Sequence, residues 1–276
     1  MNELPRIQLG PHSITRLIIG GNPFCANSHY SEEMSRDMDE YFTAQRVVEV
    51  LRRCEKAGIN TVQARGDYHR VLYWLERYRR EGGKMQWIAQ TASEMADVFQ
   101  NIRVLAAAGA IAIYHHGTQT DKFWHEGRID DALDYLKCMR DCGVQVGLGT
   151  HIPDVIRYAE EHCWDVDFYM ACFYDLSRKP RESALVSGRS NYDLEEFREE
   201  DPPAMCEVIR QTPKPCLAFK ILAANRKCAS QQDVGRAFRF AFDNIKSTDA
   251  VVVGMFPKYS DQVAENVAHT LAAVQS

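Results

Sequence analysis

The stretch AGAIAIY, residues 108–114, joins the end of a helix-forming segment to an apolar run through Gly109. The same join occurs in AGINTV at residues 57–62 and in CGVQVG at residues 142–147. A glycine just past the last helical turn ends the helix, and the apolar run that follows is typical of a strand buried on both faces. This helix–glycine–strand join closes βαβ units, so it predicts parallel strands that alternate with helices.

Outward from these joins, short apolar runs recur about eight times, and helix-period segments occupy residues 42–57, 95–108 and 129–142. Eight such units predict a single closed (β/α)8 barrel over residues 1–276, a usual size for that fold. A doubly wound open sheet is the alternative. The expected strands are residues 17–19, 61–63, 86–90, 111–114, 145–148, 168–172, 217–219 and 251–254.

Two segments interrupt this alternation. Residues 21–42 follow the first expected strand and are long and polar, and residues 175–202 follow the sixth and are highly charged, with little helical pattern. Long loops that follow the strands of a barrel lie on its catalytic face, where they act as lids or substrate walls. An ordinary surface insertion explains both segments equally well.

Composition excludes several classes of function. The 33 Lys and Arg residues against 38 Asp and Glu residues give a net charge of −5, which argues against a nucleic-acid partner. No apolar run has the length of a membrane span or a signal peptide. Nine cysteines without a C-x-x-C pair indicate a reduced, cytoplasmic protein. We expect a small-molecule substrate, and the sequence leaves the oligomeric state open.

Polar and titratable side chains follow the expected strands, where a barrel brings them together at one face. Such groups are costly to bury unless they are paired or functional, so their convergence predicts an enzyme with a polar pocket. These residues are Asn22, Gln63, Arg65, Asp67, Tyr68, Gln90, Thr91, Glu94, His115, His116, Thr150, His151, Cys172, Tyr174, Lys220 and Lys258.

Five segments in this order resemble a divergent aldo-keto reductase over nearly the whole chain. They are IQLGPHSITRLIIGGNPF (7–24), AGINTVQARGDY (57–68), IYHHGTQTD (113–121), GVQVGLGTH (143–151) and VVVGMFPKYSDQVAEN (251–266). Members of that family are barrels that open with a short β-hairpin and reduce carbonyl groups with a nicotinamide cofactor. The resemblance therefore implies an oxidoreductase that uses NADP or NAD on a small carbonyl or sugar-like substrate.

The family's catalytic tetrad of Asp, Tyr, Lys and His is only half retained. The resemblance implies that Tyr68 donates the proton and that His115, or His116 beside it, is the histidine. The aspartate position is Gln63 and the lysine position is Gln90 or Thr91, none of which carries a charge. Without the lysine, a phenol with a pKa of about 10 is a poor acid near neutrality.

Lys220, in AFKILAAN at the end of the seventh expected strand, is the candidate replacement for the missing lysine. It could assist Tyr68 as a cation or act as a Schiff-base nucleophile. It could equally be paired with Asp67 or Glu94, or anchor a phosphate. We take Tyr68, His115, Lys220 and Asp67 as the catalytic candidates.

Cofactor contacts are expected near the last helix. The resemblance matches the family's Glu-Asn pair to Glu265 and Asn266, and it places Gln262 where an arginine reads the 2′-phosphate of NADPH. Lys258 precedes that helix, whose amino-terminal end attracts a phosphate, and an ordinary surface lysine is the alternative. Thr150, at the end of the fifth strand, completes the expected cofactor set.

Two other classes of function remain open at this point. His115, His116 and His151, with Asp67 or Glu94, could hold a divalent metal and support a metal-assisted lyase, isomerase or hydrolase. Cys172, and His29 in the first long loop, could join such a site. Histidines at such positions are more often hydrogen-bonded side chains than ligands. The chain could also be a non-catalytic binding barrel.

Overall fold

A computed structural model describes residues 3–66, 69–92, 95–180 and 192–275. Eight parallel strands close into a barrel in chain order, because the last strand pairs with the first, Val251 opposite Leu17. This confirms the predicted α/β TIM barrel, and the open-sheet alternative is wrong. The barrel strands are β3 (Leu17–Gly20), β4 (Thr61–Arg65), β5 (Gln86–Gln90), β6 (Ala112–His115), β7 (Gln145–Thr150), β8 (Phe168–Cys172), β9 (Cys216–Phe219) and β10 (Ala250–Gly254).

The wall of the barrel separates two apolar cores, and alternate residues of each strand face opposite cores. On β6, Ala112 and Tyr114 belong to the inner core, together with Ile18 and Ile88 from other strands. Ile113, between them, belongs to the outer core beneath the helices. The phase of this alternation decides which side chain at the end of each strand reaches the mouth of the barrel.

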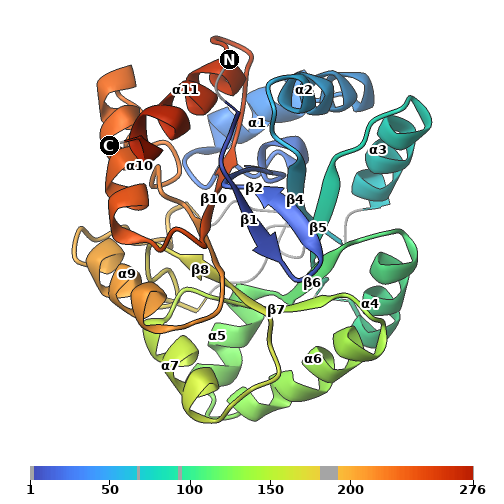
Figure 1. The fold of residues 1–276 in the computed structure, drawn as a ribbon, viewed down its shortest axis with the longest axis vertical. Coiled ribbons are helices and arrows are strands. Elements are labelled where there is room, and N and C mark those ends of the chain that lie inside the picture. The colour runs from blue at the N-terminus through green and yellow to red at the C-terminus, as the bar shows by residue number, and fades with distance from the viewer. Residues whose placement is uncertain (1–2, 67–68, 93–94, 181–191, 276) are drawn as a thin grey trace.

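A short hairpin closes the amino-terminal end of the barrel, as the resemblance implied. β1 (Arg6–Leu9) and β2 (His12–Thr15) pair antiparallel, and Ile7, Leu9 and Ile14 join the inner core. Gly10 makes the turn with a φ of +57°, and a Cβ there would lie 2.2 Å from Oε1 of Gln145. Figure 1 shows the hairpin lying across one end of the barrel. This turn therefore fits tightly against β7.

The helices surround the strands on the outside (Figure 1). Several begin with a side-chain cap, as where the Ser31 hydroxyl accepts the amide hydrogen of Met34 at 3.1 Å. They are η1 (Pro23–Cys25), α1 (Glu32–Tyr41), α2 (Ala44–Lys56), α3 (His69–Arg80), α4 (Val98–Ala107), α5 (Gly117–His125), η2 (Ile129–Asp131), α6 (Ala132–Asp141), α7 (Pro153–Glu161), α9 (Asp201–Gln211), α10 (Gln231–Asn244) and α11 (Gln262–Val274).

One loop expectation and one helix prediction need correction. The first long segment, residues 21–42, contains the helix α1, because Ser31 caps it and Met38 gives it a buried contact. The predicted helix 95–108 begins only at Val98, where Asp97 caps it by accepting the amide hydrogen of Gln100, and Met95 is exposed. Among the described residues, no helix has the length and apolar character needed to cross a membrane.

Candidate active site

A cleft of about 800 Å³ opens at the carboxyl ends of β3, β9 and β10. Its inner end reaches the barrel mouth at Gln63, Phe219 and Lys220, and its outer end runs between α1 and the start of α11. This is the face on which barrel enzymes carry their active sites, and the volume is typical of small-molecule and cofactor sites. The expectation of a pocket at the strand ends is therefore met by a real cavity.

Lys220 enters this cleft because its backbone adopts an unusual conformation. Leu217 belongs to the inner core and Ala218 to the outer core, so regular alternation would direct Phe219 inward and the next side chain outward, beneath the helices. Lys220 instead has a φ of +59°, and its side chain lines the cleft with 10% of its surface exposed. A left-handed conformation costs a residue with a side chain about 1–2 kcal/mol. Such strain is typical of functional sites.

Glu195 is the acidic partner of Lys220, and no motif in the sequence marks it. Its carboxylate is fully buried, with Oε2 3.9 Å from Lys220 Nζ and Oε1 2.8 Å from His29 Nδ1. The other ring nitrogen of His29 lies 3.1 Å from the side-chain amide nitrogen of Asn22. An amide nitrogen only donates, so His29 accepts there and donates from Nδ1 to Glu195. Lys220 lies on the other carboxylate oxygen of Glu195, as its cationic partner.

Arg226 also connects these loops, through one hydrogen bond and two aromatic contacts. Its guanidinium donates to the backbone carbonyl of His29 at 3.1 Å, and it lies 4.0 Å from the ring centre of Phe197 and 5.5 Å from that of Tyr30. Burial lowers the pKa of Arg226, and attraction to Glu195 partly offsets that effect. Three loops, which follow β3, β8 and β9, thus meet around one buried carboxylate.

A buried His–Asp pair stands at the end of β7. His151 donates from Nδ1 to Oδ2 of Asp121 on α5 at 2.5 Å, and both side chains are almost fully buried. The other carboxylate oxygen accepts the Thr150 hydroxyl at 2.6 Å and the His151 amide at 3.1 Å. The ring of His151 packs edge-on against Phe219, 5.7 Å between centres. Asp121 therefore fixes the orientation and tautomer of an imidazole at the barrel mouth.

Neutral side chains occupy the positions at which the resemblance places a charged Asp–Lys pair. Gln63 donates from Nε2 to the Tyr114 hydroxyl at 2.8 Å, and that hydroxyl donates to Oε1 of Gln90 at 2.7 Å. Tyr114 is 4% exposed and reaches this point from β6. Tyr114 thus forms hydrogen bonds with both side-chain amides, and none of these three side chains carries a charge.

His115 lies on the other side of the barrel wall from where the sequence analysis expected it. Its ring accepts or donates a hydrogen bond with the Thr120 hydroxyl at 2.8 Å and stacks between Phe123 and Tyr135. Complete burial lowers the pKa of His115 to about 4, with Asp121 opposing the shift. The expected place of His115 in the pocket was wrong, because Tyr114 rather than His115 faces inward on β6.

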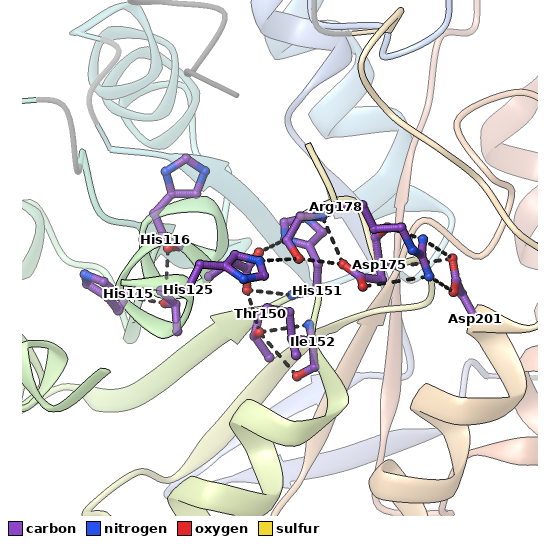
Figure 2. A network of polar contacts seen from close by, with 12 residues as sticks. His115, His116, His125, Thr150, His151, Ile152, Asp175, Arg178 and Asp201 are labelled. Carbon is purple, nitrogen blue, oxygen red and sulfur yellow. Dashed lines mark hydrogen bonds and ion pairs between the residues drawn. The ribbon is translucent and has the colours of Figure 1, made fainter. Parts of the chain in front are cut away.

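The three histidines expected to hold a metal do not converge. Figure 2 shows His115, His116 and His151 at separate places, with their rings directed differently. The backbone amide of His116, at the start of α5, donates to the Thr91 hydroxyl at 3.0 Å. Within the ranges that the structure describes, no group of three His, Cys, Asp or Glu side chains could hold a metal ion.

The expected cofactor residues separate into two groups. Gln262 and Asn266 line the cleft, although Oε1 of Gln262 already accepts the amide hydrogen of Phe256 at 2.7 Å. Lys258 forms an ion pair with Asp37 on α1, and hydrogen bonds from Lys258 and Tyr259 lower the pKa of that carboxyl. Thr150 belongs to the His151 pair at the end of β7, since its hydroxyl is bound to Asp121.

Several sequence-based candidates lie outside the described residues, namely Asp67, Tyr68 and Glu94. Conversely, Asp121, Glu195 and Arg226 were missed. Asp121 stands within the segment IYHHGTQTD but has no distinctive neighbours, and Glu195 is one of many acids in a charged stretch. His29 was expected only as a possible metal ligand, and the structure instead places it against Glu195.

The chain matches no family model, and no curated protein is significantly similar to it in sequence. Among solved structures, a truncated 3-deoxy-D-arabino-heptulosonate 7-phosphate synthase from Thermotoga maritima has a TM-score of 0.55 at 13% identity, covering 99% of this chain and 90% of that one. The glycerol dehydrogenase AKR11B4 from Gluconobacter oxydans has a TM-score of 0.53 at 11% identity, with the same coverages. Identities this low establish the TIM-barrel fold alone, and they do not place the chain among the aldo-keto reductases.

Proposed function

We propose that the protein is an oxidoreductase that reduces a small carbonyl or sugar-like compound with a nicotinamide cofactor. The observation that carries the proposal is the buried His151–Asp121 pair at the barrel mouth, where the ring of His151 packs against Phe219, a residue that lines the cleft of about 800 Å³. Reduction of a carbonyl carbon creates an alkoxide, which requires a proton from a positioned acid. An imidazole oriented by a carboxylate is a common donor of that proton.

In this proposal His151 donates the proton from Nε2, the ring nitrogen that Asp121 does not engage. Asp121 stabilises the protonated ring before the transfer and holds its orientation afterwards. Lys220, at the inner end of the cleft, supplies a positive charge near the carbonyl oxygen. This assignment replaces Tyr68, the donor expected from the resemblance, and the two are separated by the variants below.

The cleft suits NADH better than NADPH. When bound, a nicotinamide cofactor supplies the hydride, and Asn22, Gln262 and Asn266 offer amide groups along the cleft to hold it. Among the described lining residues, four carboxylates face only two cations, and Lys258 is engaged with Asp37. An additional 2′-phosphate would meet repulsion from this acidic lining. The lining residues with charge are Glu33, Arg36, Asp37, Glu40, Lys220 and Glu265.

Titration of the protein with NADH and NADPH, followed by cofactor fluorescence, tests the first step. We expect saturable binding of NADH in the micromolar to millimolar range and weaker binding of NADPH. Oxidation of the bound cofactor is then measured with small hydroxyaldehydes and hydroxyketones. Absence of binding by either nucleotide at millimolar concentration removes the proposal.

Two variants separate the candidate proton donors. We expect His151→Gln to lower turnover by about 10²–10⁴-fold, the usual contribution of a general acid. Tyr68→Phe should change it by less than about tenfold if His151 is the donor. The opposite pattern would return the role to Tyr68. Cofactor affinity measured on both variants shows whether the loss arises in the chemical step.

A further inference from the structure

The buried cluster around Lys220 suggests a second chemistry that needs no nicotinamide. We propose that Lys220 forms a covalent imine with the carbonyl carbon of a small aldehyde or ketone in the cleft, with Glu195 moving the protons. Among the described residues that line this cleft, Lys220 is the one primary amine. This activity goes beyond hydride transfer and can occur whether or not a cofactor binds.

The backbone of the loop after β9 is arranged to present this amine. Lys220, Ala223, Ala224 and Asn225 all have positive φ values, between 48° and 78°, and all lie within six residues. Each such residue adds strain that the surrounding structure must offset. Lys220 is thereby turned from the helix side of the wall into the cleft. A lysine needed only for solubility or for a surface ion pair would not require this conformation.

A carboxylate and a second cation lie close to the amine of Lys220. Glu195 lies 3.9 Å from Lys220 Nζ, and Arg226 and Lys220 both approach the ring of Phe197, at 4.0 Å and 6.0 Å from its centre. Among the described residues, two cations thus lie close to one buried carboxylate. The guanidinium of Arg226 keeps its proton under all ordinary conditions, whereas an ammonium can lose one. If Lys220 gives up its proton, Arg226 and Glu195 remain as a balanced pair.

The reaction balances with the amine of Lys220, which lines the cleft, and the buried carboxylate of Glu195 beside it. Glu195 accepts a proton from the Lys220 ammonium, and the free amine attacks the carbonyl carbon while the carbonyl π electrons move to oxygen. Glu195 returns the proton to that oxygen, and a second proton from nitrogen follows it as the carbon–oxygen bond breaks. Two ammonium protons leave with the carbonyl oxygen as water. The product iminium carries the same charge as the ammonium, so its attraction to Glu195 is conserved.

His29 positions the carboxylate for this proton transfer. Its Nδ1–H donates to Oε1 of Glu195, which leaves Oε2 directed toward Lys220. Asn22 holds the far side of the same ring at 3.1 Å. The carboxylate therefore cannot rotate away from the amine without breaking a hydrogen bond of 2.8 Å.

Reductive trapping tests the proposal directly. The full-length protein is incubated with dihydroxyacetone, or separately with pyruvate, and treated with sodium borohydride without nicotinamide. Intact mass should show one adduct per chain, and peptide mapping should locate it on Lys220. Lys220→Arg should reduce labelling at least tenfold. Lys227→Arg, at the next lysine of the same loop, is the matched control and should leave labelling unchanged.

Glu195→Gln tests the proton transfer. We expect at least a tenfold slower rate of trapping and loss of the pH dependence that the carboxylate imposes, with the folded state checked by thermal unfolding. Absence of an adduct with both probes, or equal labelling of Lys220 and Lys227 in the unaltered protein, overturns the proposal. Because NADH binding is measured separately, failure here leaves the oxidoreductase proposal standing, and the reverse also holds.

Discussion

The two ends of the barrel differ in the polarity of the side chains that fill them. At the amino-terminal end, Ile7, Leu9 and Ile14 of the hairpin continue the inner apolar core and close it. At the carboxyl-terminal end, the same interior finishes in hydrogen-bonded and charged side chains, such as Tyr114 and His151. One end contributes buried apolar area, which stabilises the fold, and the other buries polar groups, which is costly unless they are paired.

This contrast teaches that stability and chemistry are separated along the barrel axis. A substitution at the closed end should change the free energy of unfolding and leave the chemistry intact. A substitution at the open end should do the reverse. The predictions below test that separation from the largest expected effect to the smallest.

Asp121→Asn should give the largest effect on the reaction. An asparagine amide would donate to Nδ1 of His151, so that nitrogen could no longer carry a proton, and the doubly protonated ring that gives up the Nε2 proton would be disfavoured. We expect carbonyl reduction to fall by about 10²–10⁴-fold. Steady-state turnover with NADH measures it, and thermal unfolding checks the fold. Turnover within threefold of the unaltered protein would break the link between this pair and the chemistry.

Ile14→Ala should give the largest effect on stability. Ile14 is fully buried in the hairpin that closes the barrel, so its truncation leaves a cavity and costs about 2–5 kcal/mol. Urea unfolding measures the loss, and turnover at a temperature where the variant is folded should stay within twofold. Leu133→Ala, at a residue that is 38% exposed, is the control and should cost much less. Equal losses of unfolding free energy at Ile14 and Leu133 would contradict the expectation that the closed end of the barrel mainly stabilises the fold.

His115 lies at the open end but should behave like a structural residue. Its pKa in the folded chain is about 4, below the ordinary value of 6.5, so the unfolded chain takes up the proton first as the pH falls. The free energy of unfolding should therefore drop by up to about 3 kcal/mol between pH 6.5 and pH 4. In His115→Leu this part of the pH dependence should disappear.

The comparison for that experiment is His162→Gln, at an exposed histidine directly after the last residue of α7. Its unfolding curve should keep the same pH dependence as the unaltered protein. Turnover of His115→Leu should also be retained at neutral pH, because the ring faces the helices. A large loss of turnover would move His115 back into the chemistry.

Ala224→Gly should give the smallest effect, and it should be stabilising. Ala224 has a φ of +48°, which glycine adopts without the penalty that a Cβ imposes. We expect a gain of about 1 kcal/mol or less, since a more flexible unfolded chain offsets part of the relief. Urea unfolding measures the gain. A loss of stability would show that the strain lies elsewhere in this loop.

Much of the fold could be predicted from the sequence because its signals are local. The glycine joins and the apolar runs located all eight barrel strands to within a residue or two. The helix α1 was missed because its sequence is mostly charged, and its stability depends on the cap at Ser31 and one buried methionine. A polar helix of this kind resembles a loop when only hydrophobic periodicity is considered.

The site could be predicted only in part, because it depends on the phase of each strand and on distant loops. In IYHHG, a shift of one residue decides whether Tyr114 or His115 faces the barrel mouth, and a short apolar run does not fix that phase. Glu195 meets Lys220 only after the chain has passed through α9 and β9. The tertiary fold, rather than spacing in the sequence, brings that pair together.

The meeting of three loops around Glu195 also constrains how this barrel can be re-engineered. His29 contacts both Glu195 and Arg226, so each of the three loops depends on a residue of another. Exchanging one loop alone would leave a buried charged or polar side chain on the remaining loops without its hydrogen-bond partner. Transferring the specificity of this cleft to another barrel would therefore require that all three loops be moved together.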